Sequence, residues 1–172
     1  MIDAYCAERG IELVPNQNSF GHMERWLKFE TYRHLGEMPD GFIDPWGVFR
    51  AVSTTLAPVD HRSLELIDDL YSQLLPVVRS NLVNVGGDEP WELGQGRSAQ
   101  RSAEVGVEHV YVEYLAKLHE LTSSYGKRMM VWADVLMRPP DSVHLLPPDT
   151  IVVDWGYEAD HPFEREAAML SE

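Results

Sequence analysis

The sequence predicts an α/β fold built on a parallel sheet of about four strands. Four short runs are almost entirely apolar, as expected for strands buried on both faces of a parallel sheet. Amphipathic segments with helical spacing lie between these runs, and such alternation produces βα units with parallel pairing. The four expected strands are residues 11–15, 82–85, 129–132 and 151–155.

Two of the expected helices have a clear amphipathic pattern. Apolar residues recur every three or four positions in residues 64–78 and again in residues 107–121. Asp60 is a suitable N-cap for the first helix, and Gly126 is a suitable stop for the second. Pro76 should kink or shorten the first helix. Further helices are expected at residues 2–9, closed by Gly10, and at residues 162–170.

Residues 36–58 interrupt this alternation with several Pro and Gly residues and with the aromatic side chains Phe42, Trp46 and Phe49. A connection of this length in a compact domain is usually functional or disordered. We therefore predict a loop that lies over the site. Phe42 and Trp46 are expected to pack within the loop, and the alternative is a platform for a leaving group.

The charge balance limits the kinds of partner. The chain has 14 Lys and Arg against 28 Asp and Glu, a formal net charge of −14, which disfavours nucleic acid and anionic membranes. No stretch approaches the ~20 apolar residues that span a bilayer. The N-terminal residues lack a basic leader, and the single cysteine, Cys6, suits a reducing compartment, so we predict a cytoplasmic protein. Cys6 itself is expected to fill space in the core.

Two adjacent carboxylates follow the second expected strand. The run Val85-Gly86-Gly87-Asp88-Glu89 brings a buried strand to two glycines and then to the acids. Parallel strands deliver such residues to the carboxyl edge of the sheet, where α/β proteins place their chemistry. One carboxyl group can stay protonated as an acid while its neighbour stays ionised, which is the logic of glycoside hydrolysis.

The other strand ends also carry groups suited to a sugar. Sugars present apolar C–H faces and a rim of hydroxyls, so their pockets combine aromatic rings with amides and carboxylates. The residues after the four strands are Asn16, Gln17, Asn18, Gly21 and His22; Asp88, Glu89, Trp91 and Glu92; Trp132 and Asp134; and Trp155, Tyr157, Glu158, Asp160 and His161.

These motifs resemble the catalytic domain of family 20 glycoside hydrolases, the β-N-acetylhexosaminidases. The similarity is carried by Gly86-Gly87-Asp88-Glu89, by Gly21-His22 and by two tryptophan motifs, and it covers essentially the whole chain. The tryptophan motifs are Met130-Val131-Trp132-Ala133-Asp134 and Val153-Asp154-Trp155-Gly156-Tyr157-Glu158. The family more often has His where this chain has Asn84.

The resemblance implies roles for individual residues. Glu89 would be the general acid, and Asp88 would orient the substrate's 2-acetamido group, whose carbonyl oxygen attacks the anomeric carbon. Trp132 and Trp155 would form walls of the sugar pocket, and His22 would position the carboxylate pair. The remaining substrate-binding candidates are Trp91, Asp134, Tyr157 and Glu158.

The resemblance also implies a partial TIM barrel. The family's catalytic domain is an eight-stranded barrel, and residues 1–172 match its third to sixth strands as a single partial (β/α) barrel domain. A half-barrel leaves unpaired edges and an uncovered apolar face. We therefore predict a homo-oligomer, such as a dimer, that completes or covers the half-barrel.

Other interpretations of these residues stay open. Asp88 and Glu89 could instead cap a helix, His22 could be structural, and Glu158 and Asp160 could be solvated surface acids. His residues with metal-ligand spacing are absent from the sequence, so we expect no metal and no cofactor. The function predicted is that of a retaining β-N-acetylhexosaminidase acting on an amino-sugar glycoside. The alternatives are a catalytically inactive or glycan-binding fragment and a barrel hydrolase for sugars without an acetamido group.

Overall fold

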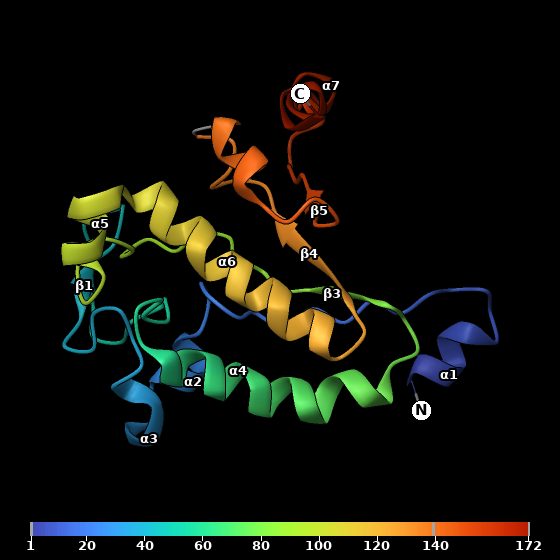
Figure 1. Cartoon of the computed structure of the whole chain (residues 1–172), viewed down its shortest axis with the longest axis horizontal. Coiled ribbons are helices and arrows are strands. Elements are labelled where there is room, and N and C mark those ends of the chain that lie inside the picture. The colour runs from blue at the N-terminus through green and yellow to red at the C-terminus, as the bar shows by residue number, and fades with distance from the viewer. Residues whose placement is uncertain (1, 139, 172) are drawn as a thin grey trace.

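A computed structural model describes residues 2–138 and 140–171. Its main sheet has three parallel strands in the order β3 (Leu82–Asn84), β4 (Arg128–Trp132) and β5 (Ile151–Val153) (Figure 1). Val83 pairs with Met129, and Val131 pairs with Val152. The helices are α1 (Ile2–Ala7), α2 (Glu24–Leu27), α3 (Glu30–Arg33), α4 (His61–Leu74), α5 (Ala99–Val105), α6 (Val107–Ser124) and α7 (Phe163–Ser171), with short 3₁₀ helices η1 (Leu75–Val77) and η2 (Pro140–Leu145).

The α/β class with parallel pairing is confirmed, but the expected first strand is wrong. Residues 11–15 form no strand, and the segment meets β3 at a single bridge between Asn16 and Asn84. In that register Glu12 lies opposite Ser80, which precedes β3, and the two side chains hydrogen-bond to each other at 2.7 Å. The segment is therefore too far toward the N-terminal end of β3 to form a ladder, and Ile11 is 56% exposed.

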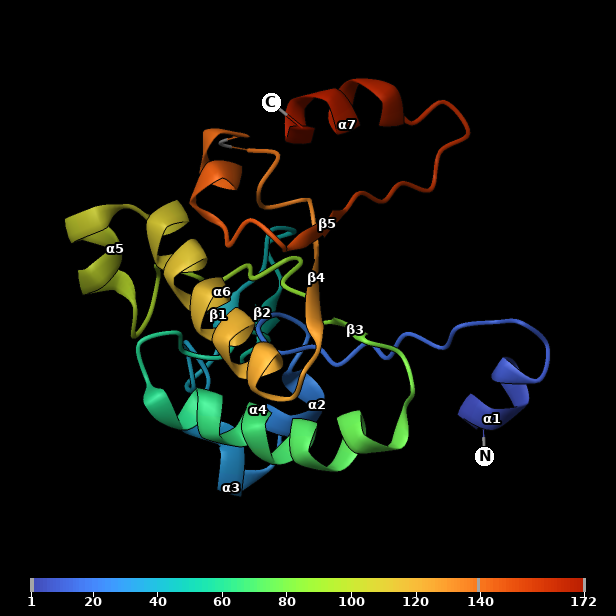
Figure 2. The same cartoon turned by 45° about the vertical axis from the view of Figure 1, so that its right-hand side comes forward.

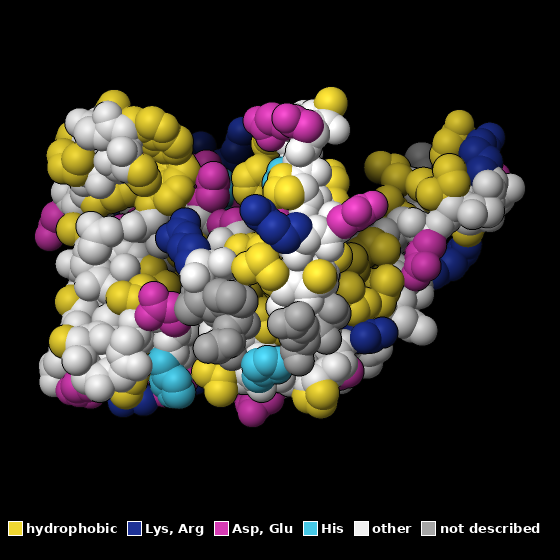
Figure 3. Space-filling model, turned by 90° about the horizontal axis from the view of Figure 1, so that it is seen from above, with side chains coloured by type: hydrophobic (Ala, Val, Ile, Leu, Met, Phe, Trp, Pro, Cys, Tyr) yellow, Lys and Arg dark blue, Asp and Glu magenta, His cyan; other side chains and the backbone are white. Residues whose placement is uncertain are grey.

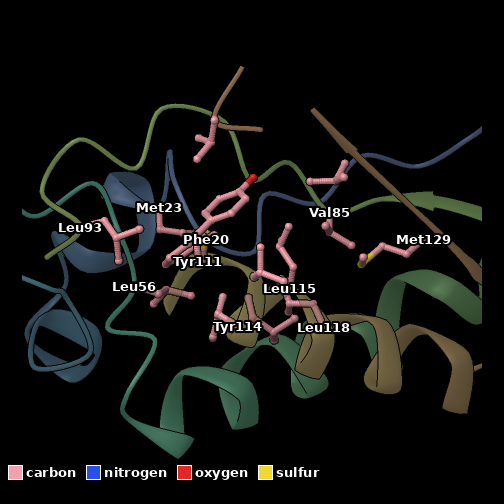
Figure 4. Packing of buried hydrophobic residues seen from close by; sticks show 14 of the residues in the cluster. Phe20, Met23, Leu56, Val85, Leu93, Tyr111, Tyr114, Leu115, Leu118 and Met129 are labelled. Carbon is pink, nitrogen blue, oxygen red and sulfur yellow. The ribbon is translucent and has the colours of Figure 1, made fainter. Parts of the chain in front are cut away.

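The core lies between the sheet and two long helices. Helix α6 packs against β4, and α4 packs against α6 (Figures 1 and 2). Tyr111 and Tyr114 on α6 are fully buried beside Phe20, which confirms their prediction as core residues (Figure 4). Both hydroxyls donate to backbone carbonyls of loops above the sheet, that of Tyr111 to Gly87 and that of Tyr114 to Ser19. The core therefore holds these two loops directly.

Several helix ends follow the sequence signals. The Asp60 side chain accepts a hydrogen bond from the Arg62 N–H at the start of α4, and α4 becomes the 3₁₀ helix η1 at Pro76. Helix α6 ends two residues before Gly126, which has a positive φ of 68°. Within the described residues, no helix combines the length and apolar character required to cross a membrane.

The expectation for Cys6 is wrong. Helix α1 contributes no buried residue, and Cys6 is only half-buried. The helix lies at one end of the molecule, away from the core (Figures 1 and 2), so its side chains have no apolar layer to fill.

The loop of residues 36–58 contains an antiparallel hairpin that was not predicted from the sequence. Its strands are β1 (Phe42–Ile43) and β2 (Phe49–Arg50). The buried carboxylate of Asp44 accepts hydrogen bonds from the backbone of Trp46 and Val48 and from the Arg50 guanidinium. Phe42 packs within the loop as expected, whereas Trp46 is 67% exposed, so its expected packing is wrong.

We predict that Asp60→Asn lowers the free energy of unfolding by about 1–3 kcal/mol at pH 7, from the loss of a cap and of charged hydrogen bonds. Hydrogen bonds from Arg62 and Arg97 hold the pKa of the buried Asp60 well below its usual range. A depressed pKa contributes stability above the ordinary pKa of aspartate, and this stability is lost as the pH falls toward the folded-state value. The difference between wild type and variant should therefore shrink below pH ~4.

Urea unfolding at several pH values measures this difference. A gap between the two proteins that stays constant from pH 7 to the acid limit would contradict the prediction.

Candidate active site

The acid pair lies just beyond the carboxyl end of β3. Val85 is buried, and the N–H of Trp132 bonds to the carbonyl of Gly86, so the loop leaves the sheet beside β4. Gly87 has a φ of 90°, and a Cβ there would lie 2.8 Å from Val131 and 3.0 Å from the Tyr111 hydroxyl. Only glycine fits this close approach to the core. Asn84 supports the same turn, since its side-chain oxygen accepts the N–H of Gly86.

The His22 imidazole meets both carboxylates. Its Nε2 lies 3.1 Å from Asp88 Oδ2 and 3.4 Å from Glu89 Oε2. A Cβ at Gly21 would collide with the backbone carbonyl of Asp88, so a glycine before His22 allows the two loops to touch. His22 and Glu89 have positive φ values of 56° and 45°, the only non-glycine examples among the described residues. Such strain persists only where the surroundings fix the backbone, and it is common at functional sites.

The electrostatics separate the two carboxyl groups. The hydrogen bond with Asp88 raises the pKa of His22, although partial burial opposes this. Burial raises the pKa of Glu89, and repulsion from Asp134 and Asp88 adds to the effect, while His22 opposes it. A glutamic acid with a raised pKa holds its proton to higher pH, as a general acid requires.

Asp134 joins this group from the end of β4. Its Oδ2 accepts the backbone N–H of Glu89 at 3.1 Å, which fixes the backbone of the residue with positive φ. Burial raises the pKa of Asp134, and the charge of Asp88 adds to this. Asp134 therefore holds the acid residue in place, a role that its position after a strand alone does not reveal.

These side chains face an open hollow of about 450 Å³. Ligand pockets commonly measure about 300–1,000 Å³. Its lining includes the predicted site residues His22, Asp88, Glu89, Trp132, Trp155 and Tyr157, together with Gly156. A larger hollow of about 510 Å³ between η2 and α7 is mostly apolar, and neither Asp88 nor Glu89 lines it.

The remaining predicted residues lie elsewhere. Trp91 contacts the edge of His22, with ring centres 6.1 Å apart, and lies outside the first hollow. Glu158 is exposed and does not line the hollow, as a solvated surface acid would be, and Asp160 is also exposed. Tyr157 is at the rim, with 90% of its side chain exposed.

His161 has turned away from the hollow. Its Nε2 lies 3.0 Å from Glu166 Oε2 and 3.8 Å from Asp154, and the ring packs against Gly156. Among the described residues, this trio alone gathers three ligand atoms within 4.8 Å of one another, the proximity that a metal site requires. The contact with Glu166 accounts for the group as an ion pair that links α7 to the segment after β5.

Glu92 has a different role from the one its sequence position suggested. Its carboxylate is fully buried and accepts hydrogen bonds of 2.5–2.9 Å from the backbone N–H and hydroxyl groups of Thr54 and Thr55. The Thr54 carbonyl in turn accepts the N–H of Met23, the neighbour of His22. Glu92 therefore joins the loop of the acid pair to the loop of His22, and no part of its carboxylate is available for a sugar.

A second buried carboxylate, that of Glu37, reinforces the same loops. It accepts hydrogen bonds from the N–H and hydroxyl of Ser98 and from the N–H of Gly96. Burial raises its pKa. The run Ser53-Thr54-Thr55, three hydroxyl residues within an apolar loop, is the sequence signal that could have indicated a buried acceptor.

Comparison with known proteins matches residues 1–169 to the model described as "Glycosyl hydrolase family 20, catalytic domain". Human hexosaminidase D is 27% identical over 159 residues, 87% of this chain and 30% of that protein. The cat β-hexosaminidase subunit beta is also 27% identical, over 88% of this chain and 28% of that protein.

Among solved structures, the chitobiase of Flavobacterium johnsoniae matches with a TM-score of 0.70 and 21% identity, over 91% of this chain and 23% of that one. The chain thus spans less than a third of the length of these three proteins.

We predict that Glu92→Gln lowers the free energy of unfolding by about 1–3 kcal/mol, because an amide N–H₂ then faces donors and leaves them unsatisfied. Glu120→Gln, at an exposed position on α6, is the matched control and should change stability little. Urea unfolding followed by circular dichroism measures both. Equal stability of the two variants would show that the Glu92 carboxylate does not hold the loops together.

Proposed function

Since the chain belongs to glycosyl hydrolase family 20, we propose that it acts as a retaining β-N-acetylhexosaminidase on terminal N-acetyl-β-hexosaminides. The observation that carries the proposal is the meeting of Asp88, Glu89 and His22 at one hollow with two tryptophans in its wall. This hollow combines a protonated acid, an ionised acid and apolar walls for a sugar.

Glu89 is the proton donor in the proposed reaction. Its raised pKa keeps the carboxyl group protonated, so it gives its proton to the glycosidic oxygen as the bond to the anomeric carbon breaks. The leaving sugar takes that proton away. The resulting carboxylate then removes a proton from the water that attacks the anomeric carbon, which restores the acid.

Asp88 orients the nucleophile, which the substrate itself supplies. The carbonyl oxygen of the 2-acetamido group attacks the anomeric carbon and forms an oxazolinium ring, an exception to the two-carboxylate scheme. Asp88 Oδ1 is buried and has no hydrogen-bond partner in the described part of the chain, so it is available to the acetamido N–H. The negative charge of Asp88 also stabilises the positive charge that develops on the ring.

The tryptophans give the hollow its selectivity. Trp132 and Trp155 line it beside the acid pair, and Trp155 meets Tyr157 edge to face. Aromatic walls of this kind favour the acetamido methyl group and the C–H face of a sugar. A glycoside without the acetamido group would lack the nucleophile.

We expect the chain to release nitrophenol from aryl N-acetyl-β-glucosaminide and not from the corresponding glucoside. Glu89→Gln should lower kcat about 100-fold or more, because the proton donor is lost. Asp88→Asn should lower it about 100- to 1,000-fold, because stabilisation of the transition state is lost. Glu120→Gln serves as the exposed control.

Hydrolysis of the plain glucoside at a similar rate would contradict the substrate-assisted mechanism. Binding of N-acetylglucosamine with no release of nitrophenol would favour the alternative, a glycan-binding member of the family.

The proposed fold is a partial TIM barrel that self-associates. The outer edge of β5 carries no strand pairing in the described part of the chain, and the opposite edge is covered only by the bridge at Asn16. Exposed edges and apolar patches favour association. Hydrophobic side chains gather in patches on one face in Figure 3, and Ile11, Ile43 and Phe163 are among the exposed apolar residues.

A dimer should therefore form at micromolar concentration. Size-exclusion chromatography with light scattering measures its mass, for which a single chain contributes 19.6 kDa. A folded chain that remains at the monomer mass across this range would contradict the proposal.

A further inference from the structure

A second hollow adjoins the first and shares His22 with it. It measures about 390 Å³ and lies between the hairpin of β1 and β2 and the start of α2. Its lining includes Glu24, Phe49, Arg50 and Trp91. We propose, on the basis of the proposed function, that this hollow binds a second pyranose ring, the sugar on the leaving-group side of the scissile bond.

The position of the acid sets the direction of the substrate. A general acid must lie within hydrogen-bond distance of the oxygen that joins the two sugars. Glu89 Oε2 is 3.4 Å from Nε2 of His22, the residue common to both hollows. A disaccharide with its linking oxygen at Glu89 and its first ring between the tryptophans therefore extends its second ring past His22 into the second hollow.

The lining of the second hollow has both kinds of group that a sugar requires. Phe49 presents a ring that is 60% exposed, and Trp91 adds a second aromatic wall. Glu24 Oε2 is buried and has no hydrogen-bond partner within the described residues. A carboxylate oxygen that lacks a donor suits the hydroxyl of a sugar, which a simple aryl leaving group does not offer.

The hairpin holds these aromatic groups in place. The Asp44 carboxylate fixes its turn through hydrogen bonds to Trp46, Val48 and Arg50. Trp46 then contacts Trp91 at right angles, with ring centres 5.0 Å apart. A rigid aromatic surface loses little conformational entropy when a ring stacks on it.

The experiment compares two ligands in the Glu89→Gln background, where hydrolysis does not remove them. Isothermal titration calorimetry measures Kd for N-acetylglucosamine and for the β-1,4-linked disaccharide of the same sugar. We expect the disaccharide to bind about tenfold more tightly, the gain typical of one aromatic stacking contact. Phe49→Ala and Glu24→Ala, each added separately, should reduce or remove this gain and leave the Kd of the monosaccharide unchanged.

Val48→Ala is the matched control, since Val48 lies exposed on the same hairpin and outside the lining of the hollow. It should keep the full gain. Equal affinity for the two ligands, retention of the gain in both test variants, or its loss in the control would overturn the second binding site while monosaccharide binding is intact. Failure of N-acetylglucosamine itself to bind would instead contradict the proposed function and the second site together.

Discussion

The buried negative charge of Glu92 is the constraint on which the site depends. A carboxylate without access to water must find hydrogen-bond donors, and four of those for Glu92 come from Thr54 and Thr55, far away in the sequence. The loop of the acid pair and the loop above α4 therefore have to close on each other when the chain folds. His22 comes to the acids through this closure, because the N–H of Met23 is bound to Thr54.

The core supports the same loops from below. Tyr111 and Tyr114 bury their rings between α6 and the sheet, and their hydroxyls bind the carbonyls of Gly87 and Ser19. Buried hydroxyls that donate to backbone carbonyls satisfy both partners and restrict the motion of the loops. Packing of the core and alignment of the acid pair are thus parts of one structure, and the open sheet can still present an ordered edge.

Local signals predicted the features that depend on few neighbours. The parallel α/β class, the cap at Asp60 and the burial of Tyr111 follow from periodicity and capping, and the resemblance to family 20 is confirmed over residues 1–169. The failed strand at residues 11–15 depends on register against β3, which an apolar run does not encode. The role of Glu92 depends on donors 37 residues or more away, and the hairpin depends on the burial of Asp44. Such long-range pairings have no periodic signature.

The left-handed backbone at His22 and Glu89 has a consequence for attempts to engineer a hardier protein. Glycine adopts this conformation without steric cost, so replacing either residue would relieve local strain. A selection that rewards heat resistance alone could therefore accept glycine at the two positions that hold the imidazole and the proton donor. Sturdier descendants of this chain would then have lost their chemistry, and a screen for robustness should be paired with one for turnover.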